Sequence, residues 1–65
     1  MICQYEVSFD HHQHRVIQVD DSFEAFYYDQ SIGIYNNLDD AANAVRWTAL
    51  LVEWKPNVTQ LLCKN

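Results

Sequence analysis

The residues of this 65-residue chain that could bind a metal fall in one short polar segment, Asp10-His11-His12-Gln13-His14. If this segment is a hairpin turn, His12 and His14 could point the same way and hold a borderline metal ion through their imidazole nitrogens. A structural zinc site normally needs four ligands at recognisable spacing, and the sequence contains no C-x-x-C pair. We therefore interpret the segment as a solvated turn, and we expect neither a metal site nor a cofactor.

Catalytic chemistry finds little support in the sequence. A single glycine leaves no phosphate-cradling loop, and there is no nucleophile-elbow motif. Cys3 and Cys63 would have to lie beside the histidines to act as nucleophiles, and both fall in apolar strand patterns that would leave them inert. The sequence therefore predicts no catalytic residue and no enzyme.

The same two cysteines bear on the redox state, because one lies near each end of the chain. In a reducing cytosol two free thiols are the default. If the two terminal strands were neighbours, the pair could come within bonding distance, which the sequence does not establish. We expect free thiols, with a native disulfide as the alternative.

The middle of the chain is acidic and has no basic residue. Residues 16–45 carry a formal charge of −6, whereas the whole chain carries −5. The carboxylates are Asp20, Asp21, Glu24, Asp29, Asp39 and Asp40. Some of them have an ordinary explanation, since carboxylates at helix starts stabilise by about 0.3–1 kcal/mol each and acidity aids solubility. Clustered on one surface, they would instead present a negative field that steers a basic partner.

The first part of the chain predicts a β-hairpin. From Cys3 to Phe9 apolar and polar residues alternate, which is the period of a strand with one wet face. Residues 15–19 resume the pattern after the polar segment. Two further strands are expected, at residues 31–35 and at 58–63.

The aromatic segment 23–28 is ambiguous. Phe23, Phe26 and Tyr27 have the i, i+3, i+4 spacing of a short helix, and Asp21 with Glu24 has the form of a capping box. We therefore expect a short helix here. A strand stays open, because aromatic residues also favour sheets.

A long helix is expected over residues 37–56. Asn37 is a suitable N-cap, the two aspartates that follow lie in the first turn, and Pro56 marks the stop. The sequence thus predicts one α+β domain over residues 1–65, in which a small, mainly antiparallel sheet packs on one long helix. The sheet is made of the N-terminal hairpin and one or two further strands.

This helix has two apolar faces when its residues are placed at helical spacing. The small-residue stripe consists of Leu38, Ala41, Ala42, Val45, Ala49 and Val52. The tryptophan stripe consists of Trp47, Leu50, Leu51 and Trp54. The first suits close approach to the sheet. The second either packs internally against residues 23–28, which we favour, or forms an exposed patch for a partner or a second subunit.

The start of the chain bears on its location. Met1 is followed by Ile2-Cys3-Gln4-Tyr5, without the basic start or apolar run of a signal peptide. The longest apolar stretch, residues 41–54, is interrupted by polar residues and is too short to span a bilayer. We therefore expect a cytoplasmic protein that contacts no membrane.

Together, a hairpin from Cys3 to Val19, an acid-rich segment from Asp20 to Asp40 and a single long helix resemble the small acidic anti-CRISPR proteins of phages and mobile elements. Some of these proteins are similar to DNA in charge distribution and block the DNA-binding surface of a CRISPR effector complex. The resemblance implies inhibition of a type I surveillance complex through its basic DNA-binding channel, in the cytoplasm of the bacterial host. It transfers no functional residue, because the group has no shared fold.

Two functions follow as hypotheses. The first is a DNA-mimicking inhibitor whose six central carboxylates contact a basic nucleic-acid-binding protein, such as a subunit of a CRISPR effector complex. The second is a small interaction or oligomerisation module that uses the tryptophan stripe. Direct binding of nucleic acid is not expected, since four basic residues stand against nine acidic ones. We expect a monomer rather than a homodimer.

Overall fold

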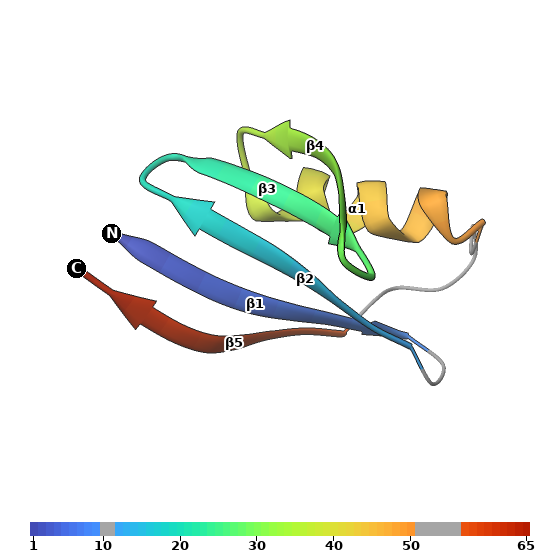
Figure 1. The fold of residues 1–65 in the computed structure, drawn as a ribbon, viewed down its shortest axis with the longest axis horizontal. Helices are drawn as coiled ribbons and strands as arrows, with labels where there is room; N and C mark the ends of the chain where they lie inside the picture. Colours follow the sequence, from blue (N-terminus) through green and yellow to red (C-terminus); the bar gives the residue numbers. More distant parts are fainter. Residues whose placement is uncertain (10–11, 51–56) are drawn as a thin grey trace.

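The computed structural model describes residues 1–9, 12–50 and 57–65. Within them, strands β1 (Ile2–Phe9), β2 (His12–Val19), β3 (Ser22–Tyr27) and β4 (Gln30–Tyr35) precede helix α1 (Leu38–Thr48) and strand β5 (Asn57–Lys64). The strands form one sheet in the order β4-β3-β2-β1-β5, with every neighbouring pair antiparallel. Figure 1 shows the helix lying behind β3 and β4, with β1 and β5 extending away from it. The predicted α+β class, an antiparallel sheet with a helix packed against it, is confirmed.

The segment expected to be a short helix is a strand, so that prediction is wrong and the alternative is right. As β3, it pairs with β2 on one side and with β4 on the other, which satisfies its backbone polar groups. Phe23 and Tyr27 pack against the core, and Phe26 lies on the opposite face of the sheet. Phe23 and Tyr27, four residues apart, therefore fit the period of two of a strand as well as a helical turn, whereas Phe26 does not share their face. Tertiary pairing decides between them.

Helix α1 is shorter than expected. Asn37 is the N-cap, as predicted, and its side-chain oxygen accepts a hydrogen bond from the Asp40 N–H. The helix ends at Thr48 rather than near Pro56. Leu50 leaves the helical region with a φ of 61°, a left-handed conformation that few side chains adopt. Pro56 lies outside the described residues.

One face of α1 builds the core. Ala41, Ala42 and Val45 are buried, and Leu38 and Ala49 pack partly against them. Small side chains let the helix approach the sheet closely, where they form one core cluster with Val7, Val16 and Ala25 from the three central strands. The expectation that the small-residue stripe faces the sheet is confirmed for these positions. Val52 lies outside the described part of the chain.

Glycine has a specific role on β4. Gly33 has a φ of 152°, and a Cβ added there would lie 2.7 Å from the Tyr35 hydroxyl oxygen. The Tyr35 ring therefore lies over the bare backbone at this position. Gly33 is paired with the buried Ala25, so the missing side chain leaves room for the aromatic ring beside the core.

The expected free thiols are not found. Cys3 of β1 and Cys63 of β5 are directly opposite each other in the sheet and form a disulfide, with their Cα atoms 4.0 Å apart. The reason is topological: the last strand returns to the edge of the sheet beside the first, which the sequence left open. Disulfides persist mainly in oxidising compartments, so the expected cytoplasmic location stays a prediction.

Candidate interaction surface

Four of the six central carboxylates lie at one end of the sheet. Asp20 and Asp21 form the turn between β2 and β3, and Asp39 and Asp40 lie in the first turn of α1. Because Phe23 pairs with Tyr35, the turn before β3 and the connection after β4 emerge at the same end. We call Asp20, Asp21, Asp39 and Asp40 the acidic end.

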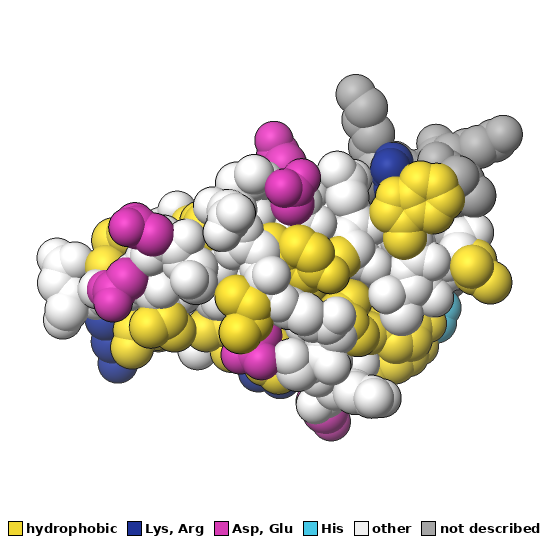
Figure 2. Space-filling model, turned by 90° about the horizontal axis from the view of Figure 1, so that it is seen from above, with side chains coloured by type: hydrophobic (Ala, Val, Ile, Leu, Met, Phe, Trp, Pro, Cys, Tyr) yellow, Lys and Arg dark blue, Asp and Glu magenta, His cyan; other side chains and the backbone are white. Residues whose placement is uncertain are grey.

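The other two carboxylates lie elsewhere. Asp29 is in the β3–β4 turn, at the opposite end of the sheet, since successive hairpin turns alternate between the two ends. Glu24 is on β3 with its side chain half-buried, and one of its carboxylate oxygens accepts a hydrogen bond of 2.6 Å from the Ser31 hydroxyl. Figure 2, which views the molecule from above relative to Figure 1, shows the acidic side chains on that side at separate places rather than in one patch. The six residues therefore do not form the single surface that clustering would require.

Within the acidic end, two carboxylates have local partners. One oxygen of Asp40 accepts a hydrogen bond of 3.1 Å from the Asn37 side-chain amide, which completes the cap of α1. One oxygen of Asp20 lies 3.1 Å from the N-terminal ammonium of Met1. Among the described residues, the carboxylates of Asp21 and Asp39 have no hydrogen bond or ion pair. Both are exposed, so they are the groups of this end best able to meet a partner.

The histidine segment contributes a core residue rather than a ligand. His14 is 1% exposed, and its Nδ1 accepts a hydrogen bond of 3.0 Å from the Tyr28 N–H. Its ring stacks on Tyr27, with centroids 4.6 Å apart. Burial lowers the pKa of His14, and the nearby His12 lowers it further. His14 is thereby held as a neutral hydrogen-bond acceptor.

Of the other members of that segment, His12 is described and contacts a tyrosine. The His12 Nδ1 atom lies 2.9 Å from the Tyr28 hydroxyl at the surface. Asp10 and His11 lie outside the described residues. Among the residues that are described, no three His, Cys, Asp or Glu side chains are grouped so that they could hold a metal ion.

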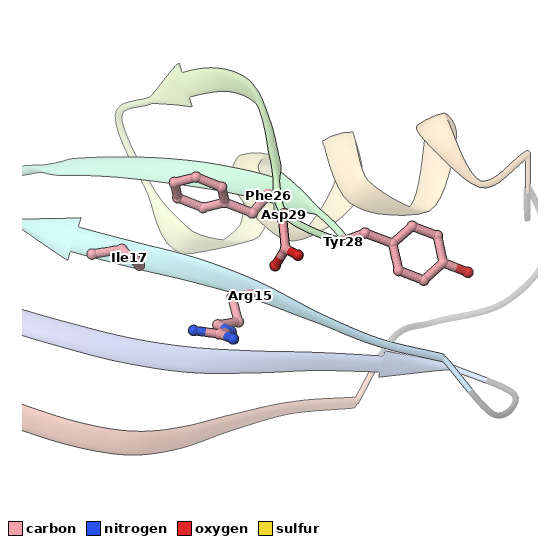
Figure 3. A pocket seen from close by; sticks show the side chains of 5 residues that line it. All are labelled: Arg15, Ile17, Phe26, Tyr28 and Asp29. Carbon is pink, nitrogen blue, oxygen red and sulfur yellow. The ribbon is translucent and has the colours of Figure 1, made fainter.

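A shallow pocket lies on the sheet face opposite the helix. It has a volume of about 130 Å³ and is lined by Arg15, Ile17, Phe26, Tyr28 and Asp29. Figure 3 shows the Asp29 carboxylate and the Arg15 guanidinium directed toward the same space, with Phe26 beside them. The pocket is too small and open to enclose a drug-sized ligand, which requires roughly 300 Å³ or more.

The tryptophan stripe is exposed where it is described. Trp47 is 54% exposed and Leu50 is 79% exposed. The guanidinium carbon of Arg46 lies 5.7 Å from the centre of the Trp47 ring, within the range of a cation–π contact. Internal packing of Trp47 and Leu50 against residues 23–28, the favoured expectation, is therefore wrong, because the helix turns its small-residue stripe to the sheet. Leu51 and Trp54 lie outside the described residues.

Sequence reasoning missed the apolar character of the uncovered sheet face. Several large side chains there are about half exposed or more: Ile2, Val19, Ile34 and Leu62. The sequence does contain a signal for this. Ile17 follows Val16 directly, and adjacent strand residues point to opposite faces, so β2 carries apolar side chains on both sides.

Comparison with known proteins finds no matching family model, no matching curated protein and no matching solved structure. Among the described residues, no helix is long and apolar enough to cross a membrane.

Proposed function

We propose that this chain is a small binding protein that engages a basic surface of its partner through the acidic end. The observation that carries the proposal is that four exposed carboxylates belong to two connections, the β2–β3 turn with Asp20 and Asp21 and the first turn of α1 with Asp39 and Asp40, which adjoin the Phe23–Tyr35 end of the sheet. Of the described basic groups, Arg15 and Arg46 belong to other parts of the fold, whereas Lys64 and the N-terminal ammonium lie at the same end of the sheet as Asp20, because Ile2 pairs with both Val19 and Lys64. Carboxylates arranged in this way present a negative field that speeds encounter with a positive surface.

The partner class we propose is a nucleic-acid-binding protein. Its basic groove is built to neutralise phosphates, and exposed carboxylates on a compact domain can occupy such a groove in place of DNA. The likeness to small acidic anti-CRISPR proteins supports a DNA-binding channel of a type I CRISPR effector complex as the specific target. The separation of Glu24 and Asp29 from the acidic end narrows the proposed contact to four residues.

The test compares two charge reversals at opposite ends of the molecule. Asp39→Lys alters the acidic end, and Asp29→Lys makes the same change in net charge in the β3–β4 turn. A type I effector complex is mixed with a fluorescent target duplex, and displacement of the duplex is measured by anisotropy. We expect the unchanged protein and Asp29→Lys to displace the duplex and Asp39→Lys to fail, with all three weakening as salt rises.

Two results would count against the proposal. Absence of displacement by the unchanged protein excludes this effector as the partner. Equal loss in both variants shows that net charge, rather than the acidic end, governs binding. Circular dichroism of each variant checks that α1 is retained, because Asp39 also lies in its first turn.

A second function is favoured by the exposure of Trp47 and Leu50. An exposed tryptophan with an arginine beside it, as in Trp47 and Arg46, consists of residue types that are enriched in interaction hot spots. An interaction module of this kind would bind through apolar contact and would keep its affinity at high salt. Trp47→Ala distinguishes the two functions, because it abolishes binding only in the second.

A further inference from the structure

We propose that the outer edge of β5 pairs with the β5 strand of a second copy of this chain, so that two sheets join into one. The proposal is independent of the acidic end. It rests on the exposure of β5, on its charge and on the way it is fixed to β1.

Strand β5 is more exposed to solvent than the three central strands of the sheet. Each of its eight residues is exposed, whereas β1, β2 and β3 each contain buried positions. Its apolar side chains are also accessible, with Leu61 52% and Leu62 47% exposed. Among the described residues only β1 pairs with β5, so the other long side of the strand carries free N–H and C=O groups. Such an edge is a template for another strand.

The alternation of hydrogen bonds shows which groups face outward. In antiparallel sheets, directly opposite residues with closely spaced Cα atoms do not exchange hydrogen bonds. Cys3 and Cys63 are such a pair, at 4.0 Å. Between Gln4 and Tyr5 the register shifts, so that Leu61 is an extra residue in β5 without a partner on β1. Tyr5 is in the same phase of β1 as Cys3, so Gln60, which is opposite Tyr5 after the shift, also directs its backbone away from β1. Gln60 therefore lies near the middle of β5 with an outward-facing N–H.

Charge selects a second copy as the occupant. The chain carries −5 overall, but β5 contains no carboxylate and has one cation, Lys64, at its end. Two copies that meet along β5 therefore bring together the least acidic parts of two acidic proteins. Antiparallel pairing about a two-fold axis also makes the strand its own partner, which closes the assembly at two copies.

The opposite edge of the sheet, formed by β4, is less suited to pairing with a second copy. Strand β4 is six residues long, and α1 packs against one of its faces. Asp29 precedes it, and the acidic end follows it. Pairing of two β4 strands would bring these carboxylates together, at a cost that pairing along β5 avoids.

The experiment measures the mass of the full chain by sedimentation velocity over a series of protein concentrations. We expect the mass to approach twice 7.7 kDa as concentration rises. The association should strengthen with salt, because salt screens the repulsion between two acidic copies. Gln60→Pro removes the outward N–H, and we expect it to remain monomeric. Gln60→Ala keeps the N–H and should associate as the unchanged protein does.

A second variant protects the test against misfolding of the proline variant. Leu61→Lys places a cation from each copy near the two-fold axis at an exposed position, so it should prevent association while the monomer stays folded. A monomer at every concentration overturns the proposal. A dimer that Leu61→Lys and Gln60→Pro leave intact also overturns it, as does a dimer lost only in Trp47→Ala, which would place the contact on α1.

Discussion

The backbone N–H of Tyr28 donates a hydrogen bond to Nδ1 of His14, at 3.0 Å, from the turn that follows β3. The bond requires that Nδ1 carry no proton. The His14 ring is also buried and stacked on Tyr27, and the exposed His12 lies on the same strand. Protonation of this one residue would therefore disturb the β3–β4 turn and the core together.

The pH dependence of stability follows from the lowered pKa of His14. As pH falls below about 6.5, the unfolded chain takes up a proton at this residue while the folded chain does not. The free energy of unfolding therefore falls with pH, by at most about 1.4 kcal/mol per pH unit from this group, until the lowered pKa is passed. Urea titrations at several pH values between 8 and about 5 measure the slope.

A matched pair of variants assigns the effect to His14. We expect His14→Gln, which keeps a hydrogen-bond acceptor but cannot titrate, to lower stability and to flatten this slope. His12→Gln makes the same change at an exposed position of the same strand and serves as the matched control. An unchanged slope in His14→Gln would show that other groups cause the pH dependence.

The disulfide should supply much of the stability of this small domain. It closes a loop with a sequence separation of 60, for which chain entropy gives about 4 kcal/mol. Cys63→Ser should lower the free energy of unfolding by roughly that amount, as should reduction of the unchanged protein. Reductant should then have no further effect on Cys63→Ser. A stability difference below about 1 kcal/mol would mean that the reduced chain is already constrained.

The two faces of α1 should differ in their effect on stability. Val45 is fully buried, so Val45→Ala should cost about 1–3 kcal/mol through lost burial and the cavity left behind. Trp47→Ala removes a much larger side chain, yet it should change stability by no more than about 0.5–1 kcal/mol because the ring is half exposed. Thermal unfolding of both variants measures the contrast. A larger loss in Trp47→Ala would contradict the orientation of the helix.

The sequence predicted local features well and contacts between distant segments poorly. The hairpin, the cap at Asn37 and the inward face of α1 depend on periodicity and on neighbouring residues, and each was predicted. The state of residues 23–28 depends on strands at both sides, so spacing alone gave the wrong answer. Pairing of Cys3 with Cys63 depends on where the last strand returns, which no local pattern encodes.

The candidate site shows the same limit. The six central carboxylates were read directly from the sequence. Their positions at two ends and on one face of the sheet were not predicted, because these positions depend on the order of the hairpins. The sequence could not decide whether Trp47 is exposed or buried, because α1 has two apolar faces and either of them could pack on the sheet. The exposure of β5 was not predicted, because its apolar run Leu61-Leu62-Cys63 indicates a strand without showing what covers its faces.

The position of β5 also has a consequence for the order of folding. Strands β1 to β4 are joined by short turns, so their contacts form between residues close in sequence, whereas β5 must find β1 across nearly the whole chain. Local contacts form faster because they close smaller loops. We expect the meander of β1 to β4 with α1 to assemble first and β5 to be added last. Newly made chains would then pass through a stage in which the edge of β1 is bare, and oxidation of Cys3 and Cys63 would end it.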